Sequence, residues 1–292
     1  MQNNKIILGT VQFGLDYGIN NKAGKPTSDA IKEILDLAFK KKINFLDTAE
    51  AYGDSQEKIG NYHSRSLNVF KVITKFSPSR KDLPNNISER IKCNLNTLEV
   101  ESLYSYMFHS YKDFKIYFSL FKKELLLMKN EGLIKKIGVS LNSNEEIEDV
   151  LNCNHIDLIQ LPFNLLDNNN QRKKTLIKAK EKGVEIHTRS VFLQGLFFKK
   201  EKSLKGNLKY LEIYLKQLHK LTSENLKIND IALNYVINQP FIDAVLIGVD
   251  NPNQLNLNLE SINKYIPKSI LEYINSIKVN EKELLNPFNW KE

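Results

Sequence analysis

Short apolar runs alternate with longer amphipathic stretches along most of this 292-residue sequence, and this alternation restricts the fold more than any other feature. The apolar runs have the length of buried strands, whereas the stretches between them place apolar residues on one helical face. In SDAIKEILDLAFKKK (28–42), Ile31, Ile34, Leu35 and Ala38 share a face, and Ser28 is the expected N-cap. The pattern predicts strands at 5–11, 44–48, 69–75, 102–109, 134–140, 157–163, 184–190 and 244–249 and helices over 28–42, 55–62, 85–98, 113–131, 143–151, 169–182, 201–223 and 229–238, with a last helix beginning near Pro252.

Eight strands that alternate with helices over this length predict an α/β fold of the (β/α)8 TIM-barrel type. A doubly wound sheet is the alternative, although it usually has fewer strands in one domain. Its dinucleotide-binding version is disfavoured because Gly9, Gly14 and Gly18 lack the G-x-G-x-x-G spacing. We find no clear linker, so we expect a single barrel domain over residues 1–292, with a C-terminal tail from about residue 263.

The composition of the chain disfavours two kinds of partner, nucleic acid and membrane. The net charge of +8 is spread over helix-like segments in which lysines alternate with glutamates, so no basic stripe for nucleic acid is predicted. No apolar run approaches the roughly 20 residues of a membrane span, and the N-terminus lacks the pattern of a signal peptide. We therefore expect a cytoplasmic protein, a monomer or small homo-oligomer, with neither a nucleic-acid nor a membrane partner.

Metal chemistry is also disfavoured by the sequence. Cys93 and Cys153 lie in different segments without metal-ligand spacing, which indicates reduced thiols. We find no His-x-His pattern and no cluster of carboxylates, so a metal-dependent barrel hydrolase is a weak alternative and no metal site is expected.

Three consecutive predicted strands each end on an ionisable side chain. Asp47 ends the second strand, Lys75 the third and His109 the fourth, and Tyr52 follows in the loop after the second strand. Each of these residues alone has an ordinary explanation as a cap, a solvated charge or a packed ring. In a (β/α)8 barrel, however, the carboxyl ends of the strands surround the active site. The four residues together therefore predict a catalytic site.

The chemistry that these four residues favour is proton transfer. A free phenol has a pKa near 10, which is high for acid–base catalysis at neutral pH. A nearby ammonium group lowers that pKa, and a carboxylate paired with the lysine keeps the cation in place. We expect Tyr52 to act as a general acid tuned by Lys75 and Asp47, while His109 donates a hydrogen bond to the substrate oxygen.

The segment DTAEAYGDSQEKIG (47–60), with Lys75 and His109 downstream, resembles the aldo-keto reductase superfamily, as does LGTVQFG (8–14) at the start of the chain. The resemblance extends to IGVDNPNQLNLNLE (247–260) and so covers nearly the whole chain. It implies a (β/α)8 barrel that binds a nicotinamide cofactor in extended form and reduces carbonyl groups by hydride transfer without a metal. It also implies the roles given above to Tyr52, Asp47, Lys75 and His109.

The resemblance implies cofactor contacts along the carboxyl ends of the strands. Gln160 matches the residue that binds the nicotinamide carboxamide, and Ser140 fits a similar role, although Leu141 replaces the usual asparagine. The run 190–195 fits the loop that holds the pyrophosphate. The implied cofactor residues are Gly9, Thr10, Ser140, Gln160, Arg189, Ser190, Leu193, Gly195, Gly248, Asp250, Gln254 and Asn258.

Two of these cofactor positions depart from the family pattern. Arg189 stands where many members place an aromatic ring that stacks on the nicotinamide, and its charge would repel the oxidised, cationic ring. We therefore expect it to favour the reduced cofactor. Asp250 stands where many members place Lys or Arg for the 2′-phosphate of NADP, and a carboxylate there suits a ribose hydroxyl instead. NADP(H) is the family's usual cofactor, and NAD(H) is the alternative.

The substrate is expected to be a small-molecule carbonyl compound, with a keto-sugar or nucleotide-linked sugar suggested by the LGTVQFGLDYG opening, which resembles a branch associated with carbohydrate metabolism. The candidate substrate residues are Gln12, Phe13, Tyr17, Phe76, Tyr111 and Phe163. Two alternatives stay open. One is a nicotinamide-binding subunit that senses redox state without turnover, and the other is an epimerase or eliminating enzyme that uses a bound cofactor for internal redox.

Overall fold

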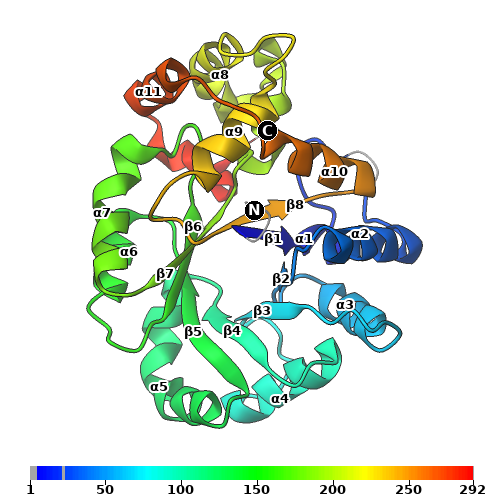
Figure 1. Ribbon diagram of the computed structural model, residues 1–292. Helices are drawn as coiled ribbons and strands as arrows, with labels where there is room; N and C mark the ends of the chain where they lie inside the picture. The colour runs from blue at the N-terminus through cyan, green and yellow to red at the C-terminus, as the bar shows by residue number, and fades with distance from the viewer. Residues whose placement is uncertain (1–4, 22–23, 292) are drawn as a thin grey trace.

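The computed structural model describes residues 5–21 and 24–291, and it confirms the predicted (β/α)8 barrel. Eight parallel strands pair in chain order, and β8 pairs with β1 to close the barrel (Figure 1). They are β1 (Ile6–Gly9), β2 (Phe45–Asp47), β3 (Lys71–Phe76), β4 (Leu103–Phe108), β5 (Ile134–Ser140), β6 (Leu158–Pro162), β7 (Glu185–Arg189) and β8 (Ala244–Gly248). The predicted domain also includes residues 1–4, 22–23 and 292, which lie outside the described residues.

Strand side chains alternate between the barrel interior and the layer beneath the helices. The interior is filled by a separate apolar cluster that contains Ile7, Ile73, Met107, Leu158, Ala244 and Leu246. Residues one position away, such as Leu8, Val72 and Phe108, belong to a much larger cluster between strands and helices. This alternation decides which strand residues reach the carboxyl-end mouth of the barrel and which pack behind it.

The helices surround the barrel, and all but the last two lie between successive strands (Figure 1). They are α1 (Val11–Gly14), α2 (Ser28–Lys40), α3 (Ser55–His63), α4 (Ile87–Leu98), α5 (Tyr111–Asn130), α6 (Asn144–Val150), α7 (Asn169–Glu181), α8 (Glu212–His219), α9 (Ile228–Ile237), α10 (Pro252–Ser261) and α11 (Lys268–Ser276). At the start of α2 the N-cap is Thr27 rather than the predicted Ser28, because the Thr27 hydroxyl accepts a hydrogen bond from Ala30 N at 3.2 Å. Ser143 and Glu146 form a capping box at α6.

Three segments differ from the sequence prediction. The first strand ends at Gly9 rather than at residue 11, because Val11–Gly14 turns into α1. The helix predicted over 201–223 is divided into the short 3-10 segments η3 (Glu201–Ser203) and η4 (Gly206–Leu211) before α8. Gly206 has a φ of 51°, a left-handed conformation that interrupts a helix. The expected tail contains α11 and two further 3-10 segments, η5 (Lys282–Leu285) and η6 (Pro287–Asn289).

The C-terminal segment packs onto the barrel through the start of α7. Asn168 Nδ2 donates to the carbonyl oxygens of Ile274 and Ile277 at 2.8 and 3.0 Å. Both acceptors lie at the end of α11, where carbonyl groups lose their helical partners. Across the described part of the chain, every helix is too short or too polar to cross a membrane.

Candidate active site

A cavity of about 540 Å³ lies at the carboxyl ends of the strands. Its inner wall includes the last residues of four strands, Gly9, Asp47, Arg189 and Gly248, and Gln160 from the middle of β6. The outer wall comes from the loops after β1 and β7, from the start of α9 and from one side of α10. This is the end of a (β/α)8 barrel at which active sites are found.

Asp47 and Lys75 form a buried ion pair at the base of the cavity. Their Oδ1 and Nζ atoms are 2.5 Å apart, and Lys75 Nζ also donates to the carbonyl of Thr48 at 3.0 Å. Gln160 Nε2 donates to the other carboxylate oxygen of Asp47 at 2.7 Å. Only 1% of the lysine side chain and 3% of the aspartate side chain are exposed, so each charge depends on the other for compensation.

Tyr52 lies in the turn between β2 and α3 and lines the cavity. Lys75 Nζ lies over the phenol ring, 5.2 Å from its centre. The His109 ring meets the same phenol edge-on, with ring centres 5.6 Å apart and an interplanar angle of 81°. Ser55 fixes the turn, because its amide donates to the Tyr52 carbonyl at 3.0 Å and its hydroxyl donates to the Thr10 carbonyl at 3.0 Å. The structure therefore brings the four predicted catalytic residues together.

The pKa of Tyr52 is shifted in the opposite direction to the one expected. We expected Lys75 to lower the pKa of the phenol, whereas burial and the charge of Asp47 raise the pKa of Tyr52, and Arg189 opposes this only in part. The physical reason is that Asp47 compensates the lysine charge within the ion pair. Burial, together with the charges of Lys75 and Arg189, lowers the pKa of His109 to about 3. At neutral pH the site therefore presents a protonated phenol and a neutral imidazole.

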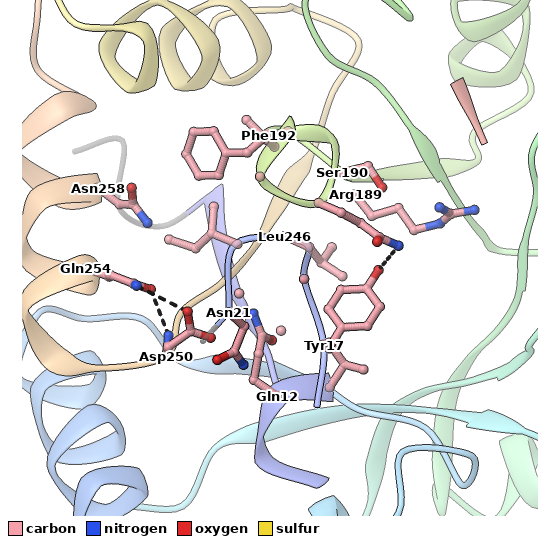
Figure 2. Close-up of a pocket in the computed structure, with 18 of the residues that line it drawn as sticks. Gln12, Tyr17, Asn21, Arg189, Ser190, Phe192, Leu246, Asp250, Gln254 and Asn258 are labelled. Carbon is pink, nitrogen blue, oxygen red and sulfur yellow. Dashed lines mark hydrogen bonds between the residues drawn. The ribbon is translucent and has the colours of Figure 1, made fainter. Parts of the chain in front are cut away.

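The part of the cavity next to α10 presents hydrogen-bond acceptors. Asp250 N donates to Gln254 Oε1 at 2.8 Å, and Gln254 Nε2 donates to Asp250 Oδ2 at 3.2 Å (Figure 2). Asp250 Oδ1 is buried without a hydrogen-bond partner among the described residues, and so is Gln12 Oε1. Buried acceptors without partners are rare in folded proteins. Two of them in one cavity wall fit a ligand that carries hydroxyl or amide donors, as a nicotinamide dinucleotide does.

Two loops meet at the rim of the cavity. Gln194 Nε2 donates to the Tyr17 hydroxyl at 2.8 Å (Figure 2), and Asn20 Nδ2 donates to the Gly195 carbonyl at 2.5 Å. Ser190, Leu193 and Gln194 have φ values of 61°, 47° and 53°, which are left-handed conformations that non-glycine residues seldom adopt. Such conformations concentrate at ligand-binding loops. This loop is the one that the family resemblance assigns to the pyrophosphate.

All but two of the predicted cofactor residues line this cavity, and the exceptions are Ser140 and Leu193. Ser140 lies in register with Gln160 on the neighbouring strand and is buried. For the Leu193 side chain the prediction of a cofactor contact was wrong. This side chain is fully buried in the apolar core and does not line the cavity. Its contribution to the loop comes from its backbone conformation.

Fewer of the predicted substrate residues than of the predicted cofactor residues line the cavity. Gln12 and Tyr17 line the cavity, whereas Phe13, Phe76, Tyr111 and Phe163 do not. Phe13 and Phe163 are fully buried in the core, and Phe163 stacks on Tyr235 with ring centres 5.7 Å apart.

For Phe76 and Tyr111 the prediction was wrong for identifiable reasons. Phe76 follows the inward-facing Lys75, so strand alternation turns its ring outward against Tyr117. Tyr111 begins α5, and its hydroxyl donates to Asp149 Oδ2 at 3.0 Å, away from the cavity. Neither contact is evident from the position of an aromatic residue in the sequence.

Several cavity residues were not identified from the sequence. Asn20, Asn21, Phe192, Phe198, Lys227, Asn229, Leu246 and Leu257 also line the cavity. Leu246 was recognisable in principle, since it lies two positions before Gly248 on β8 and therefore faces the same side. Lys227 and Asn229 come from the start of α9, and no pattern in their segment distinguishes them from other exposed helix starts.

Arg189 ends β7 and reaches across β6 toward the loop after β5. Its Nη2 atom donates to Asn142 Oδ1 at 2.7 Å and, weakly, to the Leu141 carbonyl at 3.4 Å. Arg172 lies behind this loop, where it donates to the Asn142 carbonyl at 2.6 Å and forms a two-point ion pair with Asp167. Burial lowers the pKa of Arg189 from its usual value. An arginine remains charged at neutral pH nevertheless.

The sequence is similar to known oxidoreductases. The profile of the Aldo/keto reductase family matches residues 5–279. An uncharacterised oxidoreductase of Bacillus subtilis (strain 168), YqkF, is 24% identical over 254 residues, which are 79% of this chain and 81% of the relative. The region matched by the family profile, residues 5–279, includes every predicted catalytic and cofactor residue.

Solved structures share the fold. An aldo-keto reductase from Bacillus halodurans in its holo form has a TM-score of 0.77 at 19% identity, covering 95% of this chain and 94% of its own. A glycerol dehydrogenase from Gluconobacter oxydans has a TM-score of 0.71 at 20% identity, covering 99% of this chain and 94% of its own. Among the described residues of this chain, no three His, Cys, Asp or Glu side chains are grouped as metal ligands.

Proposed function

Because the chain belongs to the aldo/keto reductase family, we propose that it reduces an aldehyde or ketone to the alcohol with NADH or NADPH as the hydride source. The observation that carries this proposal is the placement of a protonated Tyr52 in the cavity wall, next to the Asp47–Lys75 ion pair and in ring contact with a neutral His109 behind it. A sugar-type carbonyl compound is the substrate class that the sequence suggests.

The cavity has room and chemistry for the cofactor. The chemistry that a reduced nicotinamide supplies when bound is a hydride for the carbonyl carbon. Gln160 would hold the nicotinamide end, the loop 190–195 the pyrophosphate, and Asp250, Gln254 and Asn258 the adenosine end. The unpartnered Oδ1 of Asp250 is an acceptor for a ribose hydroxyl and would repel a 2′-phosphate. We therefore propose that NADH is accepted at least as well as NADPH.

Tyr52 transfers its hydroxyl proton to the carbonyl oxygen as the new C–H bond forms at the carbon. The carbonyl oxygen thus becomes a hydroxyl group, and the alcohol product has the same charge as the carbonyl substrate. Lys75, over the ring, stabilises the phenolate that forms on Tyr52 until solvent returns the proton. His109, being neutral, donates a hydrogen bond to the same substrate oxygen and polarises the carbonyl. The phenol is protonated at neutral pH, so the resting site holds the proton that carbonyl reduction consumes.

The test combines a binding measurement with a turnover measurement. Purified protein is titrated with NADH and NADPH by nicotinamide fluorescence, and oxidation of the bound cofactor is then followed with a panel of aldehydes and ketones. We expect Tyr52→Phe to bind the cofactor like the wild type and to lose about 100-fold or more in turnover, the range for removing a general acid. Tyr210→Phe, at a side chain that is 65% exposed, is the matched control.

The two alternatives give different results in the same experiment. A redox-sensing subunit would bind the cofactor and turn over no carbonyl compound. An epimerase or eliminating enzyme would convert a sugar without net change in nicotinamide absorbance. Failure of both NADH and NADPH to bind would contradict the proposal outright.

A further inference from the structure

The turn that carries Tyr52 also contains a fully buried carboxylate. Glu50 lies between Asp47, where β2 ends, and Tyr52, and none of its side chain is exposed. Glu50 does not line the active-site cavity, so it is not placed to contact a ligand there. Removing a charge from water is costly, and a buried carboxylate is tolerated only where partners compensate it. The partners of Glu50 therefore indicate what this charge does.

The carboxylate of Glu50 is saturated with hydrogen bonds. Oε1 accepts from Asn94 Nδ2 at 2.8 Å and from the Tyr106 hydroxyl at 2.7 Å. Oε2 accepts from Arg90 Nη2 at 2.6 Å and from Ser77 N at 2.8 Å. Arg90 also completes a buried ion pair, since only 4% of its side chain is exposed. These partners come from α4, from β4 and from the residue after β3, so one carboxylate holds three elements together.

The backbone of Glu50 is attached to the same strand end. Glu50 N donates to the Lys75 carbonyl at 3.1 Å, and Arg80 Nη1 donates to the Glu50 carbonyl at 2.7 Å. Directly afterwards the chain turns, and Tyr52 N donates to the Ala49 carbonyl at 3.0 Å. Glu50 thus connects the turn that presents the phenol with the strand residue that supplies the ammonium group over its ring.

We propose that Glu50 is a positioning residue, which sets the placement of Tyr52 relative to Lys75 by attaching the turn after β2 to the end of β3 and to α4. This inference rests on the proposed function, in which Tyr52 gives its proton to the carbonyl oxygen. Displacing a reacting group by about 1 Å can cost about 100-fold in rate. Glu50 itself gives up no proton and forms no bond with the substrate.

The kinetic test is a double-mutant cycle between Glu50 and Tyr52. Glu50→Gln keeps the shape of the side chain and removes its charge, and turnover is followed with NADH and either glyceraldehyde or benzaldehyde. We expect kcat to fall by about 10-fold or more while the Kd for NADH changes by less than about threefold, as for a group that acts in the transition state only. In the Tyr52→Phe background the same replacement should not lower kcat further, because the residue that it positions no longer carries the proton. Equal losses of kcat in both backgrounds would overturn the proposal.

A spectroscopic readout makes the test independent of turnover. Tyrosine labelled with ¹³C at Cζ is incorporated, and the signal that is missing in Tyr52→Phe identifies Tyr52. We expect Glu50→Gln to move the Tyr52 signal, together with that of Tyr106, whose acceptor is altered. Arg80→Gln serves if Glu50→Gln does not fold, because it removes the bond to the Glu50 carbonyl and otherwise only an exposed pair with Asp82. It should also move the Tyr52 signal.

Asp157→Asn is the matched control. Asp157 likewise holds a strand amide and a cation, since its Oδ2 accepts from Ile137 N at 2.9 Å and lies 2.6 Å from Lys129 Nζ. It directly precedes β6, at the end of the barrel opposite the cavity. We expect a lower free energy of unfolding in urea for this variant, with wild-type kcat and an unmoved Tyr52 signal. A loss of kcat as large as that of Glu50→Gln would show that destabilisation alone lowers turnover and would overturn the proposal.

The outcomes separate this inference from the proposed function. A wild type that reduces neither aldehyde counts against the function, whereas a moved Tyr52 signal in Glu50→Gln still supports the positioning role. A wild type that reduces an aldehyde, together with an unchanged kcat and an unmoved Tyr52 signal in Glu50→Gln, supports the function and overturns the positioning role.

Discussion

Gly14 and Tyr52 are in direct backbone contact. A Cβ atom on Gly14 would lie 1.7 Å from the Tyr52 carbonyl oxygen and 2.8 Å from Ser55 N, so only glycine fits there. The contact is reciprocal, because a Cβ atom on Gly53 would lie 2.5 Å from the Gly14 carbonyl oxygen and Gly53 has a φ of 54°. The end of α1 and the turn that carries Tyr52 therefore fix each other, and the position of the phenol depends on a segment almost forty residues earlier in the chain.

Gly14→Ala is expected to displace the Tyr52 turn. Overpacking against backbone atoms typically costs about 1–3 kcal/mol, and the backbone here has no side chain to move aside. We expect a lower free energy of unfolding in urea denaturation and a loss of carbonyl reduction larger than the loss of NADH affinity. Gly132→Ala is the control, since nothing lies within 4 Å of the added carbon and only its φ of 79° is strained. Equal effects of both variants on turnover would contradict the proposed contact.

Asp47→Asn is expected to leave Lys75 as a buried charge without a counter-ion. Breaking a buried pair in this way costs about 3–5 kcal/mol at pH 7. Burial already lowers the pKa of Lys75, and loss of Asp47 lowers it further. At a pH between the lowered pKa of Lys75 in the folded variant and the usual lysine pKa, the unfolded chain binds a proton at Lys75 and the folded chain does not. The free energy of unfolding of the variant should therefore rise as the pH rises from 7 to 9 and recover part of the loss.

The measurement is urea denaturation at pH 7, 8 and 9, with Glu272→Gln as the control. Glu272 forms an exposed ion pair with Lys268, so its replacement should change the stability little. A penalty for Asp47→Asn that is independent of pH would mean that Lys75 does not lose its proton in the variant.

His109 should make the protein sensitive to acid. Its pKa is lowered from 6.5 to about 3, so between these values the unfolded chain binds a proton at this residue and the folded chain does not. The free energy of unfolding therefore falls as the pH falls from about 6.5, by at most about 1.4 kcal/mol per pH unit from this group. His109→Gln should lose less stability than the wild type between pH 7 and pH 5. An unchanged slope in His109→Gln would show that the imidazole is not held neutral by the fold.

Asp250→Arg should shift the cofactor preference toward NADPH. The variant replaces an unpartnered carboxylate oxygen with donors that match a 2′-phosphate. We expect the ratio of NADPH to NADH affinity to rise by about 10-fold or more in fluorescence titrations, while Asp29→Asn on the exposed face of α2 leaves it unchanged. If the wild type already prefers NADPH strongly, Asp250 does not set the preference, and Lys227, which lines the same cavity, becomes the residue to replace.

Tertiary contacts decided the features that the sequence pattern left undetermined. The phenylalanine after Lys75 appeared as suitable for the cavity as any other aromatic residue, but strand alternation placed the lysine inside and Phe76 outside. The pKa direction of Tyr52 was predicted wrongly, because burial and the pairing of Lys75 with Asp47 depend on residues brought together from separate strands. Likewise, the absence of a carboxylate partner for Arg189 among the described residues follows only from where the neighbouring acidic groups point.

The sequence by itself determined the barrel and the set of strand-end residues. Period-two and helical patterns are local, and the end of an apolar run lies within one residue of the end of its strand, so Asp47, Lys75 and His109 could be placed at one mouth from the sequence, although β3 ends at Phe76 and β4 at Phe108. Which side chains turn into the cavity, which charges compensate one another and which acceptors lack partners are properties of atoms far apart in the chain. They depend on distance and on exclusion of water, and only the folded structure fixes both.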